Sequence, residues 1–101
     1  MSFEMTVGLV VVNPKLYSLY RNEMMPLLEE AGGRFRYDFE VARVLRSESD
    51  AEINRAFVLQ FPNQARKERF FADARYLEIR SRLFEPAVTA IVLISEAEVR
   101  R

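Results

Sequence analysis

The order of segments along the chain constrains its fold more than any other feature of the sequence. Four short segments are apolar or alternate apolar with polar side chains, as β-strands do, and they are residues 5–12, 34–45, 55–61 and 87–95. Two longer stretches have apolar side chains at helical spacing. One helical stretch separates the first strand from the second, and the other separates the third from the fourth. The predicted order is therefore β-α-β-β-α-β.

Both helical stretches carry recognisable boundary signals. Asn13 can cap the first helix, and Asn63 can cap the second. Pro26 lies inside the first helix and predicts a kink, because a proline removes one backbone donor and crowds the preceding turn. The second helical stretch runs to about Phe84, with a break near Asp73.

This order of elements is that of the split βαβ, or ferredoxin-like, arrangement. We therefore predict an α+β fold with a four-stranded antiparallel sheet and both helices on one face. With 101 residues, the chain suits one domain over residues 1–101. The polar tail, residues 96–101, is expected to fray.

The second strand differs from the others because it alternates strictly over several residues. The alternation predicts that Phe35, Tyr37 and Phe39 share one face of this strand. The opposite face then carries a stripe of four charged side chains, Arg34, Arg36, Asp38 and Glu40. Residues 47–52 are polar and acidic and predict the turn to the third strand.

The other three strands are apolar on both faces, which bears on assembly. In the first strand, Val7 and Leu9 on one face are matched by Val10 on the other. A sheet with one face in water should alternate between apolar and polar residues. Only one face receives helices from the same chain, so we predict a homodimer in which a second copy covers the other face.

Charge and hydropathy argue against two kinds of partner. Fifteen Lys and Arg balance 15 Asp and Glu, whereas nucleic-acid-binding proteins usually carry a basic excess. The basic residues between Arg66 and Arg82 are interleaved with acidic ones, which favours a solvated helix face over a phosphate-binding surface. The apolar runs are too short to span a membrane, and the first residues do not resemble a signal peptide. We expect a cytoplasmic protein that binds neither nucleic acid nor membrane.

The chain contains neither cysteine nor histidine. Disulfides, thiolate nucleophiles, zinc or haem ligation by these residues, and a Ser-His-Asp triad are therefore excluded. Any catalysis has to use Asp, Glu, Tyr, Lys, Arg or backbone groups, and we predict no cofactor.

Several spaced residues carry a resemblance to a known family. They are Tyr20, Pro26, the Gly32-Gly33-Arg34 run, the Phe61-Pro62 pair, the Phe70-Phe71 pair, Tyr76 and Arg82. In this order the chain resembles the domain-of-unknown-function 1330 family, within the dimeric α/β-barrel superfamily. The resemblance covers residues 7–95 and implies a homodimer whose two sheets form a barrel with the helices outside. The chain has Asn13 where the family often has Asp, and residues 47–52 where it often has a glycine-bearing hairpin.

Seven residues are candidates for a ligand site, each with a structural alternative. Arg34, Arg36, Asp38 and Glu40 line a polar pocket if their face looks into the space between the sheets, and are a solvated edge otherwise. Tyr20, Tyr76 and Arg82 match family positions, and a tyrosine hydroxyl beside an arginine can donate a proton or orient an oxyanion. The alternative for this group is packing at the edge of the core. For Gly32-Gly33 we favour a helix C-cap over a ligand contact.

Three classes of function remain open. The first, which we favour, is a barrel that binds a small carbonyl or carboxylate compound, with cofactor-independent catalysis left as an open question. The second is a ligand-sensing or interaction module without chemistry, and the third is a structural dimer with a vestigial pocket. A deep pocket where arginine and tyrosine converge favours the first class. An entirely apolar pocket favours the second, and the absence of a pocket favours the third.

Overall fold

The computed structural model describes residues 1–100, and its elements follow the predicted order. The strands are β1 (Ser2–Val11), β2 (Arg34–Glu40), β3 (Arg55–Phe61) and β4 (Val88–Val99). The helices are α1 (Pro14–Glu30), α2 (Gln64–Ala72) and α3 (Ala74–Ile79), and α3 continues into the π-helical turn η1 (Arg80–Phe84). The predicted break at Asp73 is confirmed, because Asp73 ends α2 and its Oδ1 accepts the Arg75 backbone N–H at 2.8 Å.

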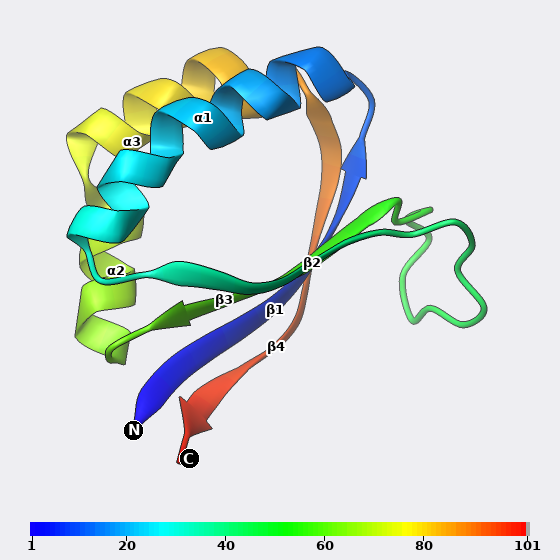
Figure 1. Cartoon of the computed structure of the whole chain (residues 1–101). Helices are drawn as coiled ribbons and strands as arrows, with labels where there is room; N and C mark the ends of the chain where they lie inside the picture. Colours follow the sequence, from blue (N-terminus) through cyan, green and yellow to red (C-terminus); the bar gives the residue numbers. More distant parts are fainter. Residues whose placement is uncertain (101) are drawn as a thin grey trace.

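The strands form one antiparallel sheet in the order β2-β3-β1-β4, and the helices lie together on one side of it (Figure 1). The α+β, ferredoxin-like prediction is therefore confirmed. Asn13 caps α1 as expected, since its Oδ1 accepts the Leu16 backbone N–H at 3.1 Å. The helix continues through Pro26 to Glu30. No helix within residues 1–100 is long and apolar enough to cross a bilayer.

Predicted boundaries of three strands were wrong, and β1 begins at Ser2 and not at residue 5. β4 does not end at residue 95, because its later residues pair with the start of β1, as Ser2 opposite Val99 shows. The tail expected to fray is thus a strand as far as Val99, and Arg101 lies outside the described residues. The second strand was predicted to end at residue 45, but β2 ends at Glu40, and no helix or strand occurs in residues 41–54.

A β-bulge in β2 overturns the predicted division of its side chains. Phe35 lies opposite Leu59 but Tyr37 lies opposite Val58, so one extra residue, Arg36, falls between the two pairs. An extra residue inverts the faces of everything that follows it. Phe35 and Asp38 consequently face the helices, whereas Tyr37 joins Arg34 on the other face. The four charged residues do not form a single stripe.

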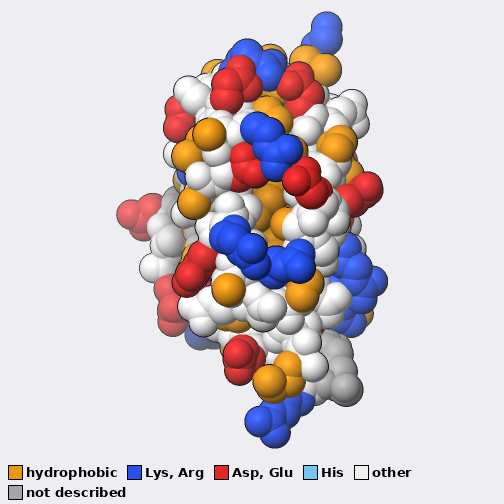
Figure 2. All heavy atoms as spheres, turned by 90° about the vertical axis from the view of Figure 1, so that its left-hand side faces the viewer, with side chains coloured by type: hydrophobic (Ala, Val, Ile, Leu, Met, Phe, Trp, Pro, Cys, Tyr) orange, Lys and Arg blue, Asp and Glu red, His pale blue; other side chains and the backbone are white. Residues whose placement is uncertain are grey.

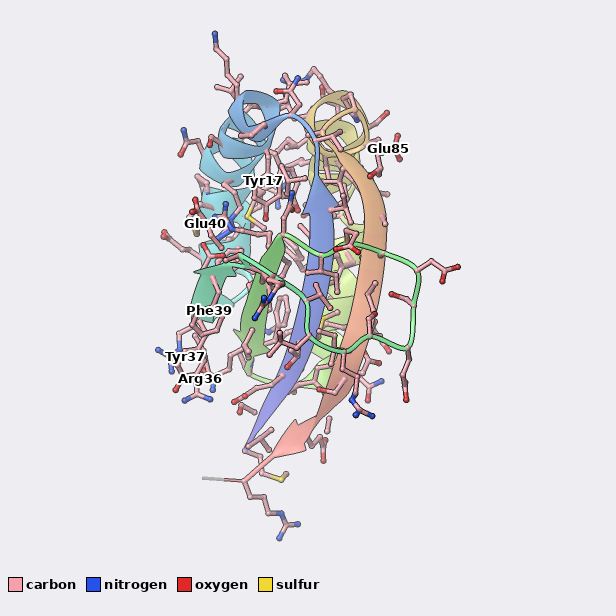
Figure 3. The ribbon with its side chains drawn as sticks, turned by 90° about the vertical axis from the view of Figure 1, so that its right-hand side faces the viewer. Tyr17, Arg36, Tyr37, Phe39, Glu40 and Glu85 are labelled. Carbon is pink, nitrogen blue, oxygen red and sulfur yellow. The ribbon has the colours of Figure 1, made fainter. Side chains whose placement is uncertain are left out.

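The hydrophobic core lies between the helices and the sheet. From β1, Phe3, Met5, Val7 and Leu9 are buried on the helix-covered face. The opposite face, called the open face below, carries the half-exposed rings of Tyr37 (50 % exposed) and Phe39 (53 % exposed). Figure 3 looks toward this face, where residues 41–54 cross in front of the sheet.

Candidate functional site

A cavity of about 580 Å³ lies between the helix-covered face of the sheet and the helices. Its lining is mainly apolar and aromatic and includes Met5, Val7, Leu9, Met24, Phe57, Leu59, Phe71, Phe84 and Leu93. This volume and this lining are typical of small-molecule sites. The cavity is therefore the first place to look for function.

Two tyrosine hydroxyls meet within the cavity lining. Tyr20 comes from α1 and Tyr76 from α3, and their hydroxyl oxygens are 2.8 Å apart. The two side chains are almost completely buried, with 5 % and 2 % exposed. The sequence predicted both residues as site candidates, and the fold places them side by side. In this hydrogen bond one hydroxyl donates and the other accepts.

Both phenols stay protonated at neutral pH because burial disfavours the phenolate. Burial is the main reason that the pKa of Tyr20 rises well above 10, and the neighbouring Tyr76 hydroxyl adds to the rise. Burial also raises the pKa of Tyr76, but the hydrogen bond with Tyr20 and the nearby charge and hydrogen bond of Arg80 oppose this rise. Either hydroxyl can donate in the bond that the two tyrosines share, and the hydroxyl that accepts keeps its own O–H available for a ligand.

Arg80 supplies the basic group of this site, and the sequence reasoning missed it. It begins η1, where the Glu85 backbone N–H donates to the Arg80 carbonyl at 3.0 Å, an i→i+5 bond of the π type. Its guanidinium carbon lies 5.1 Å from the centroid of the Phe84 ring. Within residues 1–100, no carboxylate forms an ion pair with it. A signal was present in the sequence, because Arg80 follows Tyr76 by four residues and so shares its helix face.

The cavity opens along β4, the edge strand that the helices do not reach across. Ile91 and Leu93 line the cavity, yet they are 48 % and 51 % exposed. At the same mouth, Lys67 Nζ of α2 lies 3.5 Å from Glu96 Oε2 of β4. The Lys67–Glu96 ion pair therefore connects α2 to β4 on this side of the cavity.

The opposite side of the cavity, toward β2, is closed by a cluster of charged groups. Arg55 Nε donates to Asp38 Oδ1 at 3.0 Å, and Arg21 also forms an ion pair with Asp38. The Arg21 guanidinium carbon lies 3.8 Å from the Phe35 ring centroid, and Arg21 Nη1 donates a hydrogen bond to the Tyr17 hydroxyl at 3.1 Å. Arg21 and Arg55 already pair with the carboxylate of Asp38. The cluster therefore closes this side of the cavity and is not a binding site for an anion.

The charged residues predicted on β2 are distributed over different surroundings. Arg34 lies on the open face, with its Nε donating to Gln60 Oε1 at 2.7 Å. Arg36, in the bulge, pairs with Glu4 at 3.2 Å. Asp38 belongs to the cluster with Arg21 and Arg55, and Glu40 is exposed at the strand end opposite Arg55. Arg36, Tyr37, Phe39 and Glu40 are labelled along β2 in Figure 3.

Arg82 lies outside the cavity, on the surface of the helix layer. It binds Glu23 of α1 at 2.6 Å and Glu78 at 2.8 Å. On the face seen in Figure 2, basic and acidic side chains likewise lie close together, with hydrophobic atoms visible between them. The salt bridges of Arg82 and Arg75 agree with the interpretation of this region as a solvated helix face.

Gly32 and Gly33 have structural roles in this fold. Gly32 follows the end of α1 with φ of 77°, the left-handed conformation that suits glycine. A Cβ on Gly33 would lie 2.5 Å from Leu28 Cδ1 and 3.0 Å from Phe61 Cε1. The favoured C-cap interpretation therefore accounts for Gly32, and close packing accounts for Gly33.

Comparison with known proteins agrees with this geometry at the level of family and fold. The family described as "Domain of unknown function (DUF1330)" matches residues 5–97, so the chain belongs to that family. Comparison with curated proteins gave no match.

Three solved structures illustrate the fold. A protein of unknown function from Rhodopseudomonas palustris is 17 % identical, with a TM-score of 0.82 over 99 % of this chain and 83 % of that one. A dabb family protein with a ferredoxin-like fold from Mesorhizobium loti is 15 % identical, with a TM-score of 0.59 over 99 % and 98 % of the two chains. SnoaB, a cofactor-independent oxygenase from Streptomyces nogalater, is 13 % identical, with a TM-score of 0.58 over 99 % and 92 %. At these identities the likeness concerns the fold alone.

Proposed function

We propose that this member of the DUF1330 family binds a small organic molecule with an apolar body and one carboxylate or carbonyl oxygen in the cavity between helices and sheet. One observation carries the proposal. An arginine without a carboxylate partner among residues 1–100, Arg80, lies with two buried tyrosine hydroxyls at a cavity that is otherwise largely apolar.

The chemistry of these groups suits an oxygen of partial or full negative charge. The Tyr76 hydroxyl shares a hydrogen bond with Tyr20, and the charge and hydrogen bond of Arg80 lower its pKa against the effect of burial, so we take Tyr76 as the phenol that faces the ligand oxygen. A guanidinium and a phenol O–H together bind a carboxylate or the oxygen of a polarised carbonyl. The apolar wall from β1 and β4 accommodates the remainder of the ligand.

The same groups suit cofactor-independent catalysis on a carbonyl compound. A neutral phenol next to a cation can stabilise an oxyanion or deliver a proton to it. SnoaB, which shares this fold, is described as a cofactor-independent oxygenase. The second candidate is a ligand-sensing module, and it is favoured if the cavity binds ligands without any change in their covalent structure.

We further propose that the chain works as a homodimer in which a second copy covers the open face. Tyr37 and Phe39 stack there with ring centroids 5.8 Å apart and planes 15° apart, and half of each side chain is exposed. Val58 lies opposite Tyr37 on the neighbouring strand β3, and Val92 lies opposite Gly8 on β4, at the other edge of the sheet. A sheet face of this composition is typical of an interface between sheets.

The ligand proposal can be tested by calorimetric titration with matched probes. 4-Phenylbutyrate and octanoate have an apolar body and a carboxylate, and 4-phenylbutanol has the same body without the charge. The expected result is that the carboxylates bind more tightly than the alcohol, and that Arg80→Met removes this difference. Arg82→Met, a matched change two residues away on the surface, should leave the difference intact.

Two outcomes would contradict the proposal. Binding of the carboxylates that is unchanged in the Arg80→Met variant would place the anion site elsewhere. Binding that is lost equally in the Arg82→Met variant would show that surface charge, and not the cavity, determines affinity.

A further inference from the structure

The connection between β2 and β3, residues 41–54 and called the arm below, is anchored only at its two ends. Val41 N–H donates to the Asn54 carbonyl at 2.9 Å, and Asn54 in turn hydrogen-bonds the backbone of Leu9 and Val11. Between these anchors residues 45–50 are all exposed, and Leu45 is 83 % exposed. Figures 1 and 3 show the arm standing off the open side of the sheet.

The arm occupies one end of the open face, and a polar network occupies the other. Ile53 packs directly on Gly8. Glycine leaves room for this contact, because a Cβ at residue 8 would lie only 2.6 Å from Ile53 Cδ1. Toward the start of β1, Glu4 pairs with Arg36 at 3.2 Å and accepts a hydrogen bond from Gln60 at 3.1 Å. Arg34 extends this network to the strand edge through Gln60.

This asymmetry restricts how two copies can pack face to face. If both copies pointed the same way, the two arms would meet over the same end and hold the sheets apart. A two-fold axis perpendicular to the strands turns the partner end for end, so each arm stands over the end that the other leaves free. In this arrangement each arm contacts the partner subunit and does not block the contact between the two sheets.

We propose that, in the homodimer proposed above, the arm of each subunit lies across the polar end of the partner's open face, with its acidic half beside Arg34 and Arg36. The acidic half, residues 47–54, carries Glu48, Asp50 and Glu52, whereas the two arginines of the arm, Arg43 and Arg46, lie in its first half. The polar end carries two arginines against one carboxylate, Glu4. The two surfaces are thus complementary in charge, which sets the orientation of partners more than their affinity.

The lengths are compatible with this arrangement. Four residues of β1 separate Gly8 from Glu4, which is about 13 Å at the rise of a strand. About six residues link the tip of the arm to either anchor, and a chain of six residues can extend about 20 Å. The arm can therefore reach the partner's polar end without losing its own anchors.

Cross-linking tests the arrangement directly, because the wild-type chain has no cysteine. The double variant Arg34→Cys/Asp50→Cys should form disulfide-linked dimers on mild oxidation, since residue 50 of one subunit would approach residue 34 of the other. Each single variant should remain unlinked. The control Arg34→Cys/Glu29→Cys, with its second cysteine on the helix layer, should also remain unlinked.

A charge exchange gives an independent measurement by sedimentation equilibrium. Asp50→Lys and Arg34→Glu should each weaken the dimer by about three- to tenfold, since exposed ion pairs contribute modestly. The combined variant should recover affinity, and Glu29→Lys should have no effect.

The outcomes separate this proposal from the ones it rests on. A dimeric wild type whose double-cysteine variant fails to cross-link contradicts the arm arrangement but leaves the dimer standing. Cross-linking by Asp50→Cys alone would mean that the arms of the two subunits contact each other, which also contradicts the proposed position of the arm. A monomeric wild type contradicts the arm and the dimer together, while ligand binding in the cavity remains a separate measurement.

Discussion

The hydroxyl oxygens of Tyr20 and Tyr76 lie 2.8 Å apart, although 56 residues separate the two tyrosines in the chain. Their rings meet edge to face, with centroids 6.3 Å apart and planes at 65°. The hydrogen bond joins α1 to α3 and forms part of the cavity wall. One contact thus stabilises the helix layer and supplies the polar groups of the candidate site.

Removal of either hydroxyl should separate these two roles. Tyr20→Phe and Tyr76→Phe should each lower the free energy of unfolding by about 1 kcal/mol, the net value of a hydrogen bond. Tyr76 is the phenol proposed to bind the ligand oxygen together with Arg80, so Tyr76→Phe should weaken 4-phenylbutyrate binding by about tenfold or more, and Tyr20→Phe should weaken it less. Urea unfolding and calorimetry measure the two effects, with Tyr37→Phe on the open face as the control. Equal losses of affinity in both variants would contradict the proposed role of Tyr76.

Asp38 should make the stability of the protein sensitive to acid. Partial burial raises the pKa of Asp38, but the hydrogen bonds and charges of Arg55 and Arg21 outweigh this and hold it below the usual value. A depressed folded pKa adds stability above the unfolded value of about 3.9, and this stability is lost as the pH falls toward the folded pKa. Between pH 5 and 3 the wild type should therefore lose more stability than Asp38→Asn, as measured by thermal unfolding. Glu29→Gln, at an exposed position on the helix layer, is the control, and identical slopes for Asp38→Asn and wild type would refute the prediction.

Substitutions at Gly8 and Ile53 should be energetically coupled, because Ile53 of the arm packs on the sheet at Gly8, which has no side chain. A Cβ at residue 8 would come within 2.6 Å of Ile53 Cδ1, so Gly8→Val must displace Ile53. We expect Gly8→Val to cost about 1–3 kcal/mol of unfolding free energy, as overpacked sites do. The cost should be smaller in the Ile53→Ala background, where space is available. A double-mutant cycle with zero coupling would show that Ile53 does not rest on Gly8.

The open face should control association, whereas the helix layer should not. Phe39→Glu places a charge on the open face and should shift sedimentation equilibrium strongly toward monomer. Leu19→Glu is the matched control, since Leu19 is 45 % exposed on α1. The wild type should also unfold at a temperature that rises with protein concentration. Dissociation by Leu19→Glu alone would place the interface on the helices.

The sequence was sufficient to predict the order of elements and much of the core. Strand composition, the caps at Asn13 and Asn63 and the break at Asp73 are local signals, and each was confirmed. β4 extends beyond its predicted end because it pairs with the first residues of β1, a long-range contact that local composition does not encode.

The site was harder to predict for two reasons, a one-residue irregularity in β2 and the choice of the wrong arginine on the helix. The bulge at Arg36 reverses the faces of the residues that follow it. Asp38 therefore lies on the face opposite to Arg34, where it pairs with Arg21. Arg82 was chosen by family position, whereas helical spacing from Tyr76 selects Arg80. The local pattern of alternation cannot reveal an extra residue, but the four-residue spacing was available in the sequence.

The most direct test of the proposed ligand site is a chemical-shift map of the backbone amides on titration with 4-phenylbutyrate. We predict that the largest changes occur at residues around the cavity, namely Val7, Tyr76, Arg80 and Leu93, and that they vanish in the Arg80→Met variant. Changes confined to Arg34, Arg36 and their neighbours on the open face would contradict the cavity as the binding site and would return the site to the charged residues of β2.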